Sequence, residues 1–160
     1  MAPTSEAPAP QGETGEMMVR QTPHSGALAF EFVSQGPAEG ALRVPWRADL
    51  ALDAASGVIA GGVVTSLIDH TCGLAVGAAL RTRTGAGAET ANRMGSMATL
   101  DLRIDYLRAA RPRSGVIAHA HCYKLTHSVA FVRASAYEDD PADPIATAQA
   151  AFALASAPAS

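Results

Sequence analysis

The sequence predicts an α+β fold: one long buried helix wrapped by a curved antiparallel sheet of about six strands. The first observation is an apolar segment, residues 57–80, long enough for a helix of several turns. The second is the alternation of apolar and polar residues in the segments that follow it. The third is the shortness of the connections between those segments, which requires antiparallel neighbours. A chain of 160 residues, 48% of them hydrophobic, can bury such a core as one domain.

The first half of the chain predicts two strands and the long helix. Residues 27–34 (ALAFEFVS) and 40–47 (GALRVPWR) are typical of paired strands, because a Gly-Pro break separates them. The helix is expected over residues 61–80, where the sequence is apolar nearly all round. Residues 81–95 are polar and glycine-rich, which predicts a loop.

The second half predicts four strands. In residues 96–107 the pattern places Leu100, Leu102, Ile104 and Tyr106 on one face, and Thr99, Asp101, Arg103 and Asp105 on the other. The remaining strands are expected over residues 115–125, 128–137 and 145–154, joined by polar turns.

Composition and charge limit the function and the location. Residues 1–22 are expected to be a disordered tail and residues 23–156 the folded domain. A net charge of −3 argues against a nucleic-acid partner. Asp69 and His70 interrupt the apolar segment at its centre, which argues against a membrane span. Without a targeting segment, and with cysteines that suit buried reduced thiols, the sequence predicts a cytoplasmic protein.

Asp69 and the pair Gly61-Gly62 are the candidate catalytic groups. A carboxylate in an apolar segment is costly unless another group satisfies it. Glycines at the start of a helix leave backbone N–H groups bare, and these can stabilise the oxyanion of an attacked carbonyl. Eight residues separate Gly61 from Asp69, which is about 12 Å along one helix. A two-fold axis that sets two such helices antiparallel would join them, so a homodimer or homotetramer is expected.

Three sequence blocks resemble the hotdog-fold acyl-CoA thioesterases of the phenylacetate-pathway (PaaI) type. They are GVIAGGVVTSLIDHTCG, ATLDLRIDYLRAARPRSG and KLTHSVAFVRASAYEDD, in that order. The resemblance implies a hotdog domain that hydrolyses a coenzyme A thioester, with Gly61, Gly62, Asp69 and Thr99 in the catalytic site. It implies no cofactor, since coenzyme A is part of the substrate. Ala60 stands where the family usually has a histidine.

The resemblance also implies which residues line the coenzyme A channel: Tyr106, Arg108, Arg111, Lys124, His127 and Ser128. Arg and Lys side chains at strand ends can hold phosphate groups. An ordinary solvated turn is the alternative for each of them.

The sequence leaves several alternatives open. Asp69 can act as a general base toward water or as a direct nucleophile. The missing histidine favours a second function, a hotdog module that binds acyl-CoA without hydrolysing it. His70 points about 100° away from Asp69 on the helix, which suits a structural or interface role. His119 and His121 share a strand face, but no acidic or cysteine partner stands at supporting spacing, so no metal site is expected.

Overall fold

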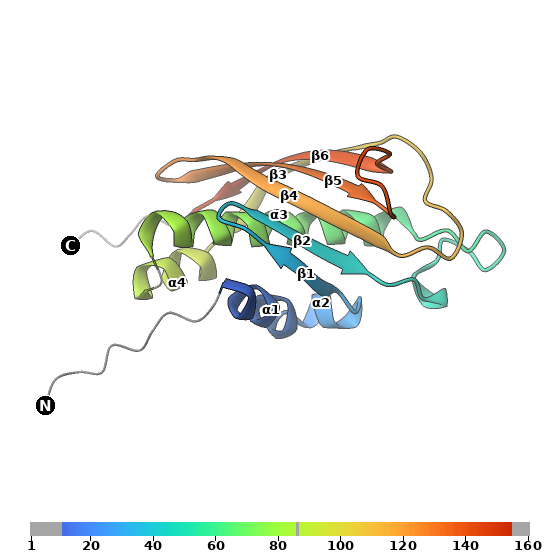
Figure 1. Ribbon diagram of the computed structural model, residues 1–160, viewed down its shortest axis with the longest axis horizontal. Helices are drawn as coiled ribbons and strands as arrows, with labels where there is room; N and C mark the ends of the chain where they lie inside the picture. Colours follow the sequence, from blue (N-terminus) through green and yellow to red (C-terminus); the bar gives the residue numbers. More distant parts are fainter. Residues whose placement is uncertain (1–10, 86, 155–160) are drawn as a thin grey trace, which may run out of the picture.

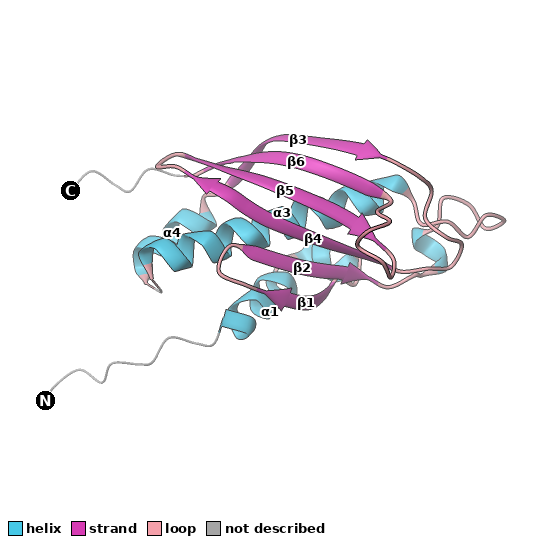
Figure 2. Cartoon of the chain, turned by 45° about the horizontal axis from the view of Figure 1, so that its top comes forward, coloured by secondary structure: helices cyan, strands magenta, loops and turns pink. Residues whose placement is uncertain are grey.

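The computed structural model describes residues 11–85 and 87–154 (Figure 1). Its six antiparallel strands form one sheet in the order β1-β2-β4-β5-β6-β3. This sheet curves over one face of a long helix (Figure 2), which confirms the α+β hotdog architecture. The strands are β1 (Glu31–Gln35), β2 (Glu39–Val44), β3 (Ala98–Tyr106), β4 (Val116–Leu125), β5 (Val129–Tyr137) and β6 (Ala146–Ala153).

The central helix α3 (Gly61–Thr84) is held against the sheet by large side chains from the helix and small ones from the strands. Leu67, Ile68 and Leu74 of α3 are completely or almost completely buried. The sheet meets them with alanines, which let helix and sheet approach closely. At Gly40 there is no room for a side chain, because a Cβ there would lie 2.8 Å from Leu74 Cγ. The alanines buried on the inner face of the sheet are Ala118, Ala120, Ala130, Ala134, Ala136, Ala146, Ala148 and Ala150.

The helix α3 is long and apolar enough to cross a membrane, with a mean hydropathy of 1.5 over its most apolar window. Of that window, 72% is buried inside the fold. Its apolar character is therefore that of a core helix.

The structure adds helices that the sequence did not predict. Helix α1 (Gln11–Gln21) lies in the segment expected to be disordered, so that expectation is wrong for residues 11–21. Val19 is buried and Met18 packs against the core, which explains why α1 is held on the fold. Residues 1–10 of the expected tail, and residues 155 and 156 of the expected domain, lie outside the described residues. A short helix α2 (Pro23–Ala27) follows, so the first strand begins later than expected.

The expected loop at residues 81–95 is also wrong. Helix α3 continues to Thr84 and ends at Gly85, whose φ of +76° suits glycine. Helix α4 (Ala88–Gly95) follows, and its Thr90 and Arg93 are buried against the body of the protein. Thr90 Oγ1 lies 2.6 Å from Thr84 Oγ1, which ties the two helices together. By contrast, β4, β5 and β6 agree with the predicted strands to within one residue at each end.

A β-bulge in β3 overturns the predicted alternation of that strand. Thr99 pairs with Phe152 and Asp101 pairs with Ala151, so Leu100 is an extra residue without a partner. The bulge brings Thr99 to the inner face of the sheet, the face predicted for Leu100, Leu102, Ile104 and Tyr106. Asp101 remains on the outer face. Strict alternation groups Thr99 with Asp101, because it allows no inserted residue.

Candidate active site

Asp69 and Thr99 meet at the open edge between α3 and β3. The Thr99 hydroxyl donates a hydrogen bond of 2.9 Å to Asp69 Oδ1. Among the residues that the structure describes, no group donates a hydrogen bond to the other oxygen, Oδ2. One carboxylate oxygen is therefore fixed, and the other is available to water or substrate.

Strand β3 runs beside α3 in the opposite direction, so its far end reaches the start of the helix. The Tyr106 hydroxyl donates to the Gly61 carbonyl oxygen at 2.7 Å. Since that phenol has one proton, Thr65 Oγ1, 3.0 Å away, donates to Tyr106 Oη. The structure thus places Tyr106 at the N-terminus of α3. Thr65 was missed, although it is a polar residue one turn after Gly61 in an apolar helix.

The N-terminus of α3 is open to a ligand. Its N-cap residue, Ala60, provides no side-chain hydrogen bond, and the Ala60 carbonyl accepts from Val63 and Val64. Within residues 11–85 and 87–154, the N–H groups of Gly61 and Gly62 have no hydrogen-bond acceptor. A Cβ added at Gly62 would meet nothing within 4 Å. Two free donors at the positive end of the helix dipole can bind a developing negative charge.

One chain does not bring these donors to Asp69. Gly61 and Asp69 belong to the same regular helix, and their separation in sequence corresponds to about 12 Å along its axis. The predicted catalytic residues therefore form two half-sites in each chain: Asp69 with Thr99, and Gly61 with Gly62.

His70 packs against its neighbours and not against Thr99. Its ring centroid lies 5.8 Å from that of Phe30 and 6.3 Å from that of His24. Burial lowers the pKa of His70, which favours the neutral ring. These contacts suit the structural role that the sequence favoured.

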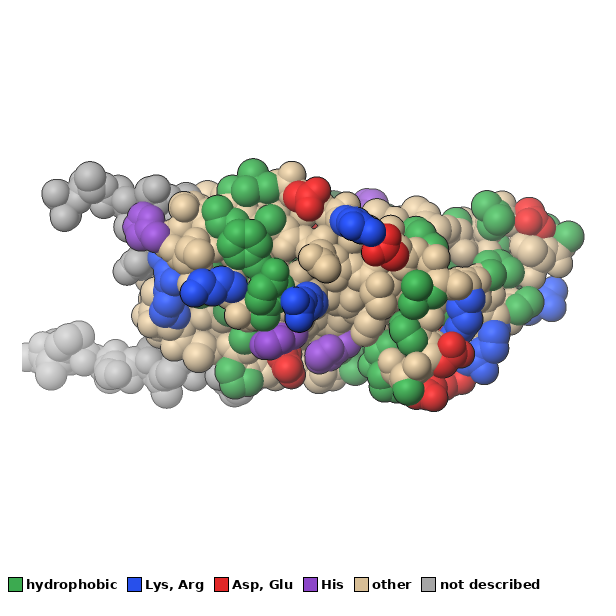
Figure 3. Space-filling view, turned by 90° about the horizontal axis from the view of Figure 1, so that it is seen from above, with side chains coloured by type: hydrophobic (Ala, Val, Ile, Leu, Met, Phe, Trp, Pro, Cys, Tyr) green, Lys and Arg blue, Asp and Glu red, His purple; other side chains and the backbone are tan. Residues whose placement is uncertain are grey.

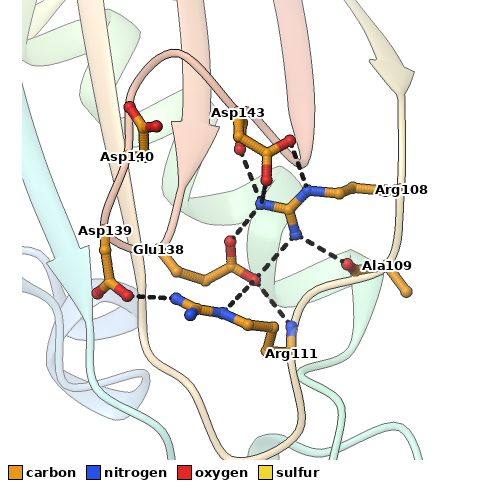
Figure 4. Close-up of a pocket in the computed structure, with 7 residues that line it drawn as sticks. All are labelled: Arg108, Ala109, Arg111, Glu138, Asp139, Asp140 and Asp143. Atoms are coloured by element: carbon orange, nitrogen blue, oxygen red, sulfur yellow. Dashed lines mark hydrogen bonds and ion pairs between the residues drawn. The ribbon is translucent and has the colours of Figure 1, made fainter.

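Arg108 and Arg111 lie in a cluster of carboxylates at one end of the sheet (Figure 4). Arg108 Nη2 lies 2.6 Å from Glu138 Oε2 and 3.0 Å from Asp143 Oδ2. Arg111 pairs with Asp139, and its backbone N–H donates to Glu138 Oε1 at 2.8 Å. Glu138 is 5% exposed, and its hydrogen bond from Arg108 lowers its pKa. The charges of both guanidinium groups are thus compensated within this pocket of about 490 Å³.

Lys124, His127 and Ser128 lie at the opposite end of the sheet, where β4 turns into β5. Arg83 was missed by the sequence analysis. Its Nη1 donates to the carbonyl oxygens of Leu125 and Thr126, at 3.3 and 2.9 Å. The predicted coenzyme A contacts therefore form two groups at opposite ends of one chain, and Tyr106, the last residue of β3, lies at the same end as Arg108 and Arg111.

His119 faces Glu39, with 3.7 Å between Nε2 and Oε2. Among the residues that the structure describes, no group of three or more His, Cys, Asp or Glu side chains is arranged to hold a metal ion.

Solved structures share this fold over most of their length. A Pseudomonas aeruginosa protein is 32% identical, with a TM-score of 0.74 over 90% of this chain and 98% of its own. The phenylacetic acid degradation protein PaaI of Thermus thermophilus is 24% identical, with a TM-score of 0.64 over 82% of this chain and 98% of its own. The latter similarity shows the fold alone.

A family model and a relative agree with that similarity. The medium/long-chain acyl-CoA thioesterase YigI of Salmonella typhimurium is 31% identical over 128 residues, which cover 79% of this chain and 82% of the relative. The model of the Thioesterase superfamily matches residues 56–145, a stretch that contains both half-sites. The chain belongs to the thioesterase superfamily.

Proposed function

We propose that this protein hydrolyses acyl-CoA thioesters to a free acid and coenzyme A, with Asp69 as its catalytic carboxylate. The observation that carries the proposal is the pairing of Asp69 with Thr99, which orients the carboxylate and leaves one oxygen open. The relative with 31% identity, named as a medium/long-chain acyl-CoA thioesterase, supports the same substrate class.

Together, the two half-sites contain the hydrogen-bond donors and the carboxylate that thioester hydrolysis requires. The N–H groups of Gly61 and Gly62 bind the thioester carbonyl oxygen and stabilise the oxyanion. Asp69 Oδ2 takes a proton from water as the water oxygen attacks the carbonyl carbon. The carbon–sulfur bond then breaks, and the sulfur leaves as a thiolate. Its conjugate acid is a thiol with a pKa of about 8.5, so no strong general acid is required.

The role of Asp69 as a base can be separated from that of a nucleophile by a single turnover in ¹⁸O-labelled water. A general base sends the label directly into the acid product. A nucleophile forms a mixed anhydride with the acyl group and releases the thiolate; when water then attacks the Asp69 carboxyl carbon of that anhydride, the first acid product leaves with an Asp69 oxygen and Asp69 acquires the label. Mass spectrometry of the product and of the peptide that contains Asp69 distinguishes the two routes.

A homodimer formed at the β3 edge would complete each site. Strand β3 ends the sheet, and Leu100, Tyr106 and Leu107 on and beside it are 51 to 61% exposed. An unpaired strand edge with apolar side chains favours pairing with a second copy. Antiparallel pairing of two β3 strands would set two α3 helices antiparallel, with Gly61 of one near Asp69 of the other.

The coenzyme A phosphates would bind best at the partner subunit's turn between β4 and β5, which the proposed antiparallel dimer would bring to the end of α3 where Gly61 and Tyr106 lie. Lys124 and His127 are exposed there, and Ser128 adds a hydroxyl group. Arg83 holds the turn carbonyls from below and adds positive charge. Arg108 and Arg111 are weaker candidates, because neighbouring carboxylates already compensate their charge.

A free-thiol release assay over a panel of acyl-CoA esters tests the function. We expect the wild type to hydrolyse members of the panel and Asp69→Asn to lose about 100-fold or more in kcat, because the amide cannot accept the proton. Asp101→Asn is the matched control, since Asp101 faces the outer side of the sheet. Equal losses in both variants would contradict the role of Asp69. Tight binding without thiol release in the wild type would support the alternative, an acyl-CoA-binding module.

We also propose that the protein is of the PaaI subtype, forms a tetramer and is located in the cytoplasm. Seen from above, hydrophobic side chains gather in two groups, one in the left part and one in the right part of the view (Figure 3). The outer faces of β4 and β5 include Tyr123 and Phe131, exposed by 44% and 36%, which suits contact between two dimers. The two free cysteines, both buried, suit a reducing compartment.

A further inference from the structure

Beyond Asp69, two glycines leave part of the α3 surface without side chains of its own. Methionine side chains from other elements pack over this part of the helix. Gly73 follows Asp69 by four residues and therefore lies on the same helix face. A Cβ at Gly73 would lie 3.5 Å from Met97 Cε and 3.9 Å from Met18 Cε. Met97 directly precedes β3, and Met18 belongs to α1. The first turn after the carboxylate is thus covered by two flexible side chains from different elements.

The next turn repeats this arrangement. A Cβ at Gly77 would lie only 2.9 Å from Met94 Cε, so Met94 of α4 occupies the space that a larger residue would need. Arg81 closes the far end, with its Nη1 4.0 Å from Met94 Sδ. Gly73 and Gly77 lie about 6 and 12 Å from Asp69 along the helix axis.

The helix surface on the other side of Asp69 is polar. It carries the hydroxyl groups of Thr65 and Tyr106 and leads to the free N–H groups of Gly61. A thioester has the same asymmetry about its carbonyl carbon, with an apolar acyl chain on one side and the polar pantetheine arm on the other. Matching apolar to apolar directs the acyl chain toward Gly73.

We propose that the acyl chain lies along α3 over Gly73, beneath Met97 and Met18, and that Met94 at Gly77 sets its maximum length. The inference rests on the proposed function and adds the determinants of chain length. Methionine side chains are unbranched and adapt to irregular apolar shapes, so they can move aside for an alkyl chain. Residues 11–21 and 88–95, which were expected to be disordered or loop, would then supply the roof of the acyl site.

A larger side chain at position 73 tests whether the acyl chain of the substrate passes over Gly73. The side chain of Gly73→Leu would occupy the position of the two methionine methyl groups. We expect kcat/KM for palmitoyl-CoA to fall about tenfold or more, since each excluded methylene group costs about fourfold in affinity. Butyryl-CoA should be hydrolysed almost as by the wild type.

Shortening the methionine side chains over α3 tests the limit on acyl-chain length in the opposite direction. Met94→Ala should raise the ratio of palmitoyl-CoA to octanoyl-CoA turnover by about fourfold. Met97→Ala should alter the turnover of palmitoyl-CoA and of octanoyl-CoA relative to that of butyryl-CoA. Met17→Ala is the matched control, because Met17 adjoins Met18 on α1 but is 55% exposed. The melting temperature of each variant shows that it is folded, and the Met94 and Met97 variants decide if Gly73→Leu does not fold.

Binding of non-hydrolysable thioethers makes the test independent of turnover. Butyl-, octyl- and hexadecyl-CoA should show the same dependence on chain length in their Kd values, even in Asp69→Asn. Losses that are equal for all chain lengths, or ratios that match the Met17→Ala control, would overturn the inference. Retained activity in Asp69→Asn would instead overturn the proposed catalytic residue.

Discussion

At the scale of single residues, Asp69 has one oxygen held by Thr99 and one oxygen open. A hydrogen bond to one oxygen fixes the carboxylate plane and with it the direction of the other oxygen. In the proposed mechanism, Thr99 is therefore a positioning residue that acts through Asp69.

Thr99→Val should lower kcat about tenfold, less than Asp69→Asn does, because the carboxylate remains but is no longer oriented. A tenfold loss corresponds to about 1.4 kcal/mol in the barrier. Thr147→Val is the control, since Thr147 lies on the outer face of β6 opposite Asp105. Steady-state kinetics with one acyl-CoA checks this prediction, and equal effects of the two variants would refute it.

Glu138 should stabilise the fold in a way that depends on pH. Glu138→Gln is expected to cost about 2 kcal/mol in the free energy of unfolding, because it removes charge-assisted hydrogen bonds from a buried carboxylate. Arg108 lowers the pKa of Glu138, so the stabilisation is complete above the unfolded-state pKa of about 4.3 and is lost as the pH falls through the lower folded-state value.

Urea unfolding of wild type and Glu138→Gln at a fixed protein concentration measures this effect. The difference between them should be largest near neutral pH and should shrink below about pH 4. A difference that stays constant over this range would mean that packing, and not charge, is responsible.

At the scale of elements, the bulge in β3 decides which residue faces the helix. One inserted residue reverses the facing of every side chain before it. Leu100 is that residue, so the bulge connects an otherwise regular strand to the proposed site.

Deletion of Leu100 should restore a regular ladder in which Thr99 still lies opposite Phe152, and we expect this variant to retain most activity. Deletion of both Leu100 and Asp101 would place Thr99 directly before Leu102 and turn it outward. For the double deletion we expect kcat to fall at least as far as in Thr99→Val, while circular dichroism shows an unchanged fold. Wild-type activity in the double-deletion variant would show that the inward facing of Thr99 is not required.

At the scale of the whole molecule, the separation between Gly61 and Asp69 is the reason for proposing that two chains share each site. The half-sites within one chain lie about 12 Å apart. Two inactive variants should therefore complement each other if their defects lie in different half-sites.

Gly61→Pro removes one N–H donor while respecting the helix start, because Ala60 has an extended ψ of 139° and proline is favoured at the first helical position. Mixed with Asp69→Asn, it should restore about a quarter of wild-type activity, since random exchange makes half the dimers mixed and each has one intact site. Subunit exchange is followed by thiol release. Absence of any recovery, with mixed dimers shown by native mass spectrometry, would assign both half-sites to one chain.

The sequence by itself determined the long core helix, the strands of the second half and the candidate residues Gly61, Gly62 and Asp69. These depend on local patterns: apolar runs, alternation, and glycines before a helix. It missed α1 and α4, because their polar composition resembles a tail or a loop and their stability comes from contacts such as those of Val19 and Thr90.

Only the tertiary structure decided which face of the sheet Thr99 lies on and which cationic side chains are paired with carboxylates. A bulge depends on the register between two strands, and alternation within one strand does not reveal it. Arg108 and Lys124 are both cations beside turns, yet only Arg108 meets carboxylates from a distant turn. Such pairings join residues far apart in sequence, so they are fixed by how the chain folds back on itself.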